Sequence, residues 1–106
     1  MKFWLLYSTV GKKREAQLIA RHLLKKRLIA CANIFPIDSL YWWKGRIEHS
    51  KEYGMIFKTS AKNYLRIEQE LSKIHPYECP CLVAIDLKRG IKPYLDWILD
   101  SIGQRE

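Results

Sequence analysis

Three side chains that can bind metal ions lie close together in the sequence, in the pattern His75-x3-Cys79-x-Cys81. Thiolates and imidazole suit Cu(I) and Zn(II), and two cysteines that are two positions apart in an extended chain point to the same side. Zinc sites, however, usually have four ligands and Cys-x2-Cys pairs. Cys81 also opens an apolar segment, in which cysteine behaves as a small hydrophobic residue. The spacing alone therefore gives little support for a metal site. His75 is the candidate metal ligand; the alternative, which the pattern favours, is a histidine at a helix end that is hydrogen-bonded to the backbone.

Motifs of a catalytic site are missing from the sequence. It contains neither the Gly-x-Gly-x-x-Gly nor the P-loop pattern that cradles phosphates. Ser8, Ser39 and Ser50 have no evident base partner that would activate them as nucleophiles. We expect a protein that is not an enzyme.

The length and composition limit what the chain can be. Its 106 residues are enough for a single domain, residues 1–106. No apolar run approaches the ~18 residues of a membrane helix, and the first residues lack the pattern of a signal peptide. Three cysteines, an odd number, argue against a disulfide framework. We expect a soluble, cytoplasmic protein without a membrane partner.

The positive charge is concentrated in one segment. The chain has 19 basic and 11 acidic residues, a net charge of +8, and residues 12–27 contain seven basic residues and a single acidic one, Glu15. A basic helix can bind nucleic acid, anionic lipid or an acidic partner, or it can be a solvated surface. The solvated surface is the interpretation that we favour from the sequence.

The apolar periodicity predicts the elements that must position these residues. A helix from Lys12 carries a stripe at helical spacing, from which Leu18 is absent: Ala16, Ile19, Ala20, Leu23 and Leu24. A second helix, capped by Ser60, runs to Ile74, with Tyr64, Ile67, Leu71 and Ile74 as its stripe. A last helix covers residues 94–102. Strands are expected at residues 2–9, 28–35, 39–43, 46–59 and 81–87.

Two features shape the predicted strands. Pro36 should bend or bulge the strand that it interrupts, and Lys44-Gly45 should form a two-residue hairpin turn. The resulting order is strand, helix, strand, strand, helix, strand, followed by an extra helix. This order predicts an α+β, ferredoxin-like βαββαβ fold with a long β-hairpin. Two helices would cover one face of an antiparallel four-stranded sheet.

The adjacent Trp42 and Trp43 raise a difficulty for a monomer. Neighbouring side chains in a strand point to opposite faces. A turn at Lys44-Gly45 pairs Trp42 with Ile47 and Trp43 with Arg46, so each face of the hairpin tip carries a tryptophan. Large exposed aromatic surface marks an interaction site. We expect the chain to associate through the sheet or the hairpin.

Five segments, taken together, resemble the CutA family of divalent-cation tolerance proteins: residues 27–33, 41–45, 57–59, 75–80 and 94–98. The resemblance spans about residues 2–102. It implies a ferredoxin-like homotrimer, similar in architecture to PII signalling proteins, in which the hairpins of neighbouring subunits interlock. Trp42 and Ile98 are then expected at the trimer interface.

The resemblance also implies a set of site residues in a cleft between subunits: Tyr41, Trp43, Glu52, Lys58, Tyr77 and Trp97, together with His75. By strand parity, Glu52 and Lys58 share one face. Such a cleft can bind a small anion or metabolite, or it can be a network that fixes the trimer; we favour the interface.

A role in copper or other divalent-cation homeostasis follows from the same resemblance. The family members implicated in copper binding have a cysteine at the position of Ser8 and a second histidine at the position of Ile74, so that His75 alone matches. The alternative function is a nucleic-acid-binding domain, because RNA-recognition domains share the fold and the charge is +8. Such domains need stacking aromatics on the sheet, and Gly54-Met55-Ile56-Phe57 matches their motif poorly. We therefore do not expect nucleic acid as a partner.

Overall fold

The computed structural model describes residues 1–105 and has the predicted order of elements. Its strands and helices are β1 (Phe3–Val10), α1 (Lys13–Lys25), β2 (Cys31–Trp43), β3 (Arg46–Ser60), α2 (Tyr64–Ile74), β4 (Val83–Leu87) and α3 (Lys92–Ser101), with a short 3-10 turn at Ala61–Asn63. The strands form one sheet in the order β2-β3-β1-β4, and all neighbouring strands are antiparallel. This confirms the α+β, ferredoxin-like class with an added C-terminal helix.

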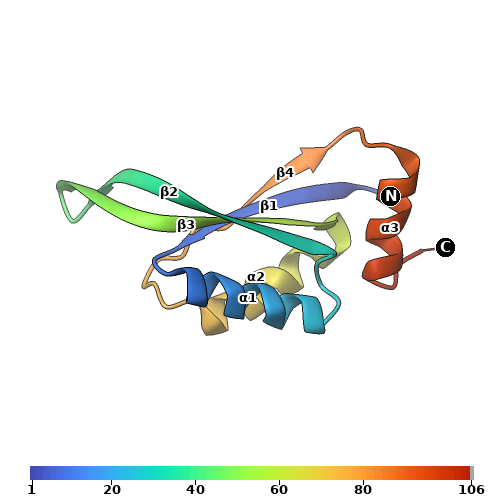
Figure 1. Ribbon diagram of the computed structural model, residues 1–106, viewed down its shortest axis with the longest axis horizontal. Coiled ribbons are helices and arrows are strands. Elements are labelled where there is room, and N and C mark those ends of the chain that lie inside the picture. Colours follow the sequence, from blue (N-terminus) through green and yellow to red (C-terminus); the bar gives the residue numbers. More distant parts are fainter. Residues whose placement is uncertain (106) are drawn as a thin grey trace.

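Helices α1 and α2 cover one face of the sheet (Figure 1). Alternate residues of the central strands point to that face, so Leu6 and Val10 of β1 meet Met55 and Phe57 of β3 in the main core. The predicted stripe of α1 is buried there at Ala16, Ile19, Ala20 and Leu23, and that of α2 at Ile67 and Leu71, with Tyr64 partly buried. The last member of each predicted stripe, Leu24 and Ile74, is exposed instead, because each lies near the end of its helix. This face of the sheet is closed by the chain itself. We call the opposite side of the sheet the open face.

Helix α3 covers only one end of the open face. Its residue Ile98 is fully buried in a second, smaller cluster with Phe3, Ala30 and Ile102, against which Leu87 and Tyr94 also pack. The helix begins at Lys92, two residues earlier than predicted, because Pro93 is well placed in a first turn. The rest of the open face lacks a helical cover (Figure 1).

The β2–β3 hairpin projects beyond the helices and makes the molecule elongated, 48 × 25 × 21 Å (Figure 1). Its turn has the predicted form: Lys44 and Gly45 both have positive φ, 51° and 78°, as in the turn that matches strand twist. The predicted pairs, Trp42 with Ile47 and Trp43 with Arg46, are confirmed.

The predicted break at Pro36 is wrong. The register of β2 on β3 runs without a bulge from Cys31–Lys58 to Trp43–Arg46. Counting from the turn, Pro36 falls at a position whose backbone nitrogen points away from β3. Because β2 is an edge strand, no second neighbour requires an N–H there.

Three predicted element ends also differ. Ser60 ends β3 and does not cap the helix; its hydroxyl donates to the side chain of Gln104. Strand β2 begins at Cys31, after a turn in which Arg27 has φ 59°. Strand β4 begins at Val83 instead of Cys81.

Candidate functional site: the open face and the hairpin

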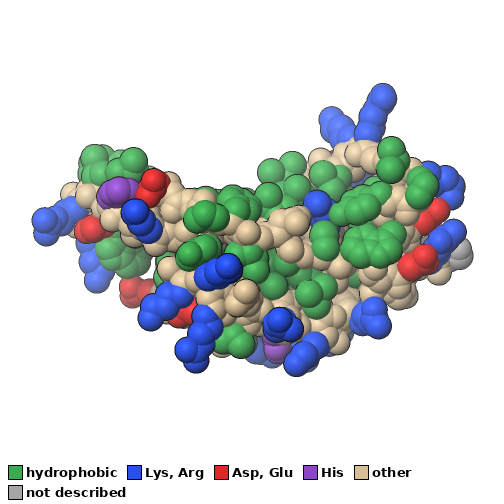
Figure 2. All heavy atoms as spheres, in the orientation of Figure 1, with side chains coloured by type: hydrophobic (Ala, Val, Ile, Leu, Met, Phe, Trp, Pro, Cys, Tyr) green, Lys and Arg blue, Asp and Glu red, His purple; other side chains and the backbone are tan. Residues whose placement is uncertain are grey.

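Apolar side chains remain uncovered on the open face and on both sides of the hairpin. Val83 and Ile85 of β4 are exposed on the open face, and Trp42, with Leu40 and Ile47, is exposed on the other side of the hairpin, beyond the helices. Trp42 is 71% exposed and Trp43 38% exposed. Figure 2 shows such hydrophobic side chains gathered at the hairpin tip and over α3. Within one chain, neither tryptophan has a core to enter.

Tyr41 and Trp43 are held by contacts within the hairpin. The Tyr41 hydroxyl lies 2.9 Å from Oγ of Ser50 on the paired strand. The ammonium group of Lys44 lies 5.7 Å from the centroid of the Trp43 ring, a distance at which a cation is attracted to the ring face. These contacts orient the two rings but leave them accessible.

Glu52 and Tyr77 form the first pair of predicted site residues that the fold brings together. The Tyr77 hydroxyl donates a short hydrogen bond to the Glu52 carboxylate, which is nearly buried. Burial raises the pKa of Tyr77, and the bond to Glu52 raises it further, so the hydroxyl remains a donor at neutral pH.

The negative charge of Glu52 also acts on two further side chains. Burial raises the pKa of Tyr7, and the neighbouring Cys81 and Glu52 add to the effect. Burial likewise raises the pKa of the Cys81 thiol, with Glu52 and Cys79 as further causes. This end of the open face therefore disfavours an additional anion and suits a cation or a neutral hydroxyl.

Lys58 marks a second, cationic end of the same face. Its ammonium group donates to Oδ1 of Asn33 at 3.3 Å and lies 5.5 Å from the centroid of the Tyr94 ring. That ring stacks on Trp97 at a centroid distance of 5.5 Å. Burial raises the pKa of Tyr94, as does the contact with Cys31, while Lys58 opposes the shift.

The two ends do not meet within one chain. Glu52 and Lys58 share a face, as their parity predicts, but six residues of strand separate them by about 20 Å at ~3.3 Å per residue. Neither Tyr94 nor Asn33 was among the residues that the sequence pointed to. Asn33 lies on the open face beside Lys58, so strand pairing and parity were the signals that would have found it. Tyr94 comes from α3, and no pattern in the sequence places that helix beside Lys58.

His75 is buried at the end of α2 and uses both ring nitrogens. Nε2 donates to the carbonyl of Thr9 at 2.7 Å, and Nδ1 accepts from the backbone N–H of Tyr77 at 3.2 Å. This is the backbone-bound arrangement given above as the alternative. Across residues 1–105, no group of three or more His, Cys, Asp or Glu side chains is placed to hold a metal ion. Coordination by His75 stays a prediction, and it would require the loss of one of these hydrogen bonds.

The two residues expected at the trimer interface lie in different environments. Trp42 is exposed, as an interface residue of a single chain should be. Ile98 is fully buried within the chain and has no surface to offer a partner. The exposed side chain of that helical turn is its neighbour Trp97.

The family described as CutA1 divalent ion tolerance protein matches residues 4–101. The chain belongs to the CutA family. A divalent-cation tolerance protein CutA from Archaeoglobus fulgidus is 43% identical over 97 residues, which are 92% of this chain and 95% of that protein. One from Thermotoga maritima is 43% identical over 98 residues, 92% of this chain and 97% of that protein.

Solved CutA structures have the same fold. That of the A. fulgidus protein, described as a periplasmic divalent cation tolerance protein, has a TM-score of 0.93 and 42% identity, covering 94% of this chain and 98% of that one. CutA1 from Pyrococcus horikoshii has a TM-score of 0.89 and 34% identity, with 92% and 96% covered. The descriptions of the family and of these relatives refer to tolerance of divalent ions, and they give no support to the nucleic-acid alternative. Among the described residues, no helix has the length and apolarity needed to cross a membrane.

Proposed function

We propose that this CutA protein is a homotrimer that binds or senses a divalent cation, copper or another, in cation tolerance and homeostasis. It acts by binding and not by catalysis. Two observations support this proposal: the description of the family as divalent ion tolerance proteins, and the uncovered apolar surface of the hairpin and the open face.

The uncovered surface carries most weight. Soluble monomers rarely leave large contiguous apolar patches exposed, yet the hairpin exposes Leu40, Trp42 and Ile47 on one side and part of Trp43 on the other. Burial of such side chains stabilises an assembly by roughly 25 cal/mol per Å² of apolar surface. A second copy seated on this surface would cover what α1 and α2 cannot reach.

Association also gives the two separated ends of the open face a role. In one chain, the Glu52–Tyr77 pair and the Lys58–Tyr94 cluster lie too far apart to hold one small ligand. In a trimer, the acidic end of one subunit can face the basic end of the next. We propose that Tyr41, Trp43, Glu52, Lys58, Tyr77 and Trp97 then line clefts between subunits, where they fix the assembly or bind a small anion.

A metal ion would bind near the acidic end. His75 is the candidate ligand, and it would exchange the Thr9 carbonyl for the ion. The thiol of Cys81 lies close to the same end of the sheet, since burial raises its pKa and Glu52 raises it further, and Cys79 is exposed. Because the pKa of Cys81 is raised, uptake through its thiolate would strengthen with rising pH.

The cytoplasm is the proposed location. Cys31, Cys79 and Cys81 are free thiols, which suits a reducing compartment. The A. fulgidus relative is described as periplasmic. Fractionation of the source cells with marker proteins would decide between the two, since recovery of the protein with the periplasmic markers would contradict this location.

Native mass spectrometry of protein grown in metal-replete medium tests the assembly and the metal together. A trimer that carries stoichiometric metal supports the whole proposal, and a bare trimer supports the assembly but refutes the metal role. A monomer would refute the proposed trimer and, with it, the clefts between subunits. His75→Ala should lower metal uptake without changing the subunit count, whereas uptake equal to that of the parent would remove His75 as a ligand.

A further inference from the structure

Almost all of the net positive charge lies on the layer formed by α1 and α2. Residues 12–27 and 61–75 contain ten basic and three acidic side chains, whereas the rest of the chain has nine basic and eight acidic ones. Figure 2 shows Lys and Arg side chains along the lower edge of the molecule, where Figure 1 places these helices. This layer lies on the opposite side of the sheet from the open face, so it stays accessible in the proposed trimer.

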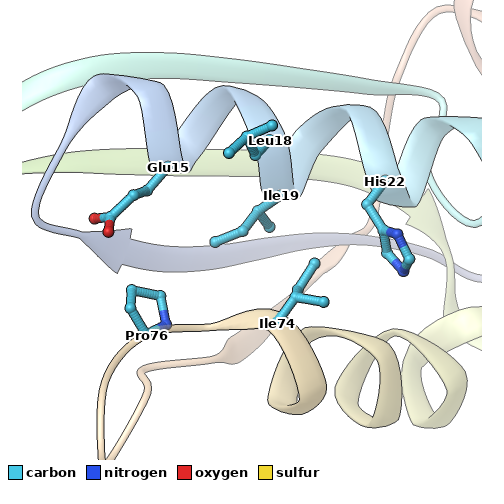
Figure 3. A pocket seen from close by; sticks show the side chains of 6 residues that line it. All are labelled: Glu15, Leu18, Ile19, His22, Ile74 and Pro76. Atoms are coloured by element: carbon cyan, nitrogen blue, oxygen red, sulfur yellow. The ribbon is translucent and has the colours of Figure 1, made fainter.

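A groove of about 400 Å³ runs between the two helices of this layer. Its lining comes from α1 and from the end of α2: Glu15, Leu18, Ile19, His22, Ile74 and Pro76. In Figure 3, Ile19 and Ile74 point toward each other across the groove, Glu15 lies at the Pro76 end and His22 points toward α2. The floor is therefore aliphatic. Leu18, which is off the core stripe, is 59% exposed at its edge.

Exposed cations flank this apolar groove. Three basic residues share the side of α1 on which Leu18 lies, because they are three, four or seven residues from it. They are Arg14, Arg21 and Lys25, and all three are exposed. Within residues 1–105, no carboxylate forms an ion pair with any of them.

The acidic side chains of the layer neutralise little of the positive charge beside the groove. Glu70 accepts a 2.8 Å hydrogen bond from His22 and lies within 4 Å of Lys26 and Lys73. Glu68 accepts from the Tyr64 hydroxyl. Glu15 stands at the end of the groove.

We propose that the groove between α1 and α2 binds an acidic amphipathic helix of a protein partner. A leucine-like side chain of that helix would enter the aliphatic groove, and its Asp or Glu residues would face Arg14, Arg21 and Lys25. Helices commonly bind grooves in this way, through apolar residues at helical spacing. The charge of the layer selects an acidic partner and speeds its association.

The composition of the layer favours a peptide over a nucleic acid. The large apolar side chains exposed on α1 and α2 are aliphatic: Leu18, Leu24, Leu65 and Ile74. Single-stranded nucleic acid is bound by aromatic side chains that stack on bases, and the exposed aromatics of this chain are found on the hairpin, on α3 and at Tyr77. An aliphatic groove binds apolar side chains and offers no favourable contact to phosphate groups.

The test uses the full chain and a labelled helical peptide that carries leucines on one face and glutamates on the other. Fluorescence anisotropy measures its binding. Leu18→Asp and Arg21→Glu should each weaken binding about tenfold, as loss of a central contact does, and added salt should weaken it further. Both side chains are exposed, so the fold should survive, which circular dichroism would check. The matched controls are Leu65→Asp, which alters a leucine that is 69% exposed on α2 outside the groove, and Lys88→Glu, which makes the same charge change beyond β4. Both should bind like the parent.

Four results would overturn the proposal. One is equal affinity for a peptide whose leucines are replaced by glutamine, since charge alone would then explain binding. The second is a loss with Leu65→Asp or Lys88→Glu as large as that with Leu18→Asp. The third is tighter binding of a single-stranded oligonucleotide that displaces the peptide. The fourth is no binding of the peptide at low salt.

Discussion

The two faces of the central sheet differ in how far one chain completes them. On the helix side, Leu6 and Phe57 are fully buried under α1 and α2. On the open face, α3 covers one end, while Val83 and Ile85 of β4 stay exposed. The strands themselves do not make this distinction, because apolar residues follow one another in both β1 and β3. Strands that are apolar on both faces are typical of sheets covered on both sides, and the proposed trimer would supply the missing cover of the open face.

The largest expected effect comes from truncation of a core side chain on the helix side of the sheet. Phe57→Ala should lower the free energy of unfolding by about 3 to 5 kcal/mol, because it removes a fully buried ring and leaves a cavity. Urea denaturation at a fixed protein concentration measures this loss. Ile85→Ala on the open face is the control and should cost a dissociated protomer less than about 1 kcal/mol. Equal losses for the two variants in the dissociated protein would contradict the contrast between the faces.

Trp42→Ala tests the uncovered hairpin. The side chain makes little contact within the chain, so the secondary structure should be unchanged. Assembly should weaken strongly, because truncation of a tryptophan that is buried in a complex costs roughly 3 to 5 kcal/mol. Native mass spectrometry across a dilution series would show the smaller species at higher protein concentration than for the parent. Leu65→Ala, equally exposed but on α2, should leave the mass unchanged; a Trp42 variant that behaves in the same way would argue against the hairpin as an interface.

Asn63→Ala should have an intermediate effect at the base of the helix side. The amide of Asn63 donates to the Leu28 carbonyl at 2.9 Å and accepts from Gln104 at 2.7 Å, and the residue is buried. Loss of these bonds should cost about 1 to 3 kcal/mol, since buried groups lose their partners. Thermal melting measures the change. Asn33→Ala, which removes a single exposed bond to Lys58 on the open face, should shift the melting temperature far less, and an equal shift would be evidence against this ranking.

The smallest expected effect concerns the contact between α1 and α2. The hydrogen bond from His22 lowers the pKa of Glu70 below its ordinary value of 4.5, and Lys26 and Lys73 add to this. A carboxyl whose pKa is lowered by folding stabilises the protein above its unfolded pKa, and this contribution disappears as the pH falls through the folded value.

Glu70→Gln should therefore reduce the slope of stability against pH below pH 4.5 and change little above that point. Melting temperatures measured from neutral pH into the acid range would show it. The control is Glu68→Gln, whose partner is the neutral hydroxyl of Tyr64, and it should keep more of the parent's slope. Parallel curves for the Glu70 variant and the parent would refute the assignment.

Much of the fold could be predicted because its determinants are local. The spacing of Ala16, Ile19, Ala20 and Leu23 gave the buried side of α1, and Lys44-Gly45 gave the hairpin register to the residue. The break expected at Pro36 failed because the effect of proline depends on whether its strand lies at an edge. Strand order is set by pairings between distant segments, which no short pattern encodes.

The site was less predictable than the fold, for the same reason. Parity placed Glu52 and Lys58 on one face but could not reveal that different partners hold them, Tyr77 and Tyr94. The buried setting of His75 depends on the Thr9 carbonyl, which is distant in sequence. Leu18 was noted as off its stripe, yet the groove beside it exists only because Ile74 and Pro76 lie opposite.

The uninterrupted β2–β3 register has a consequence for the order of folding. It joins residues close in sequence around a two-residue turn, and such contacts form within microseconds. Strand β4 instead pairs with β1 through Phe3 and Leu87, near opposite ends of the chain, and distant pairings of this kind form slowly. The hairpin, with its tryptophans, should therefore form before β4 pairs with β1, and in the proposed trimer it would be available to other chains while its own sheet is still incomplete. During refolding, completion of the sheet within one chain should compete with association between chains, and dilution should favour completion of the sheet.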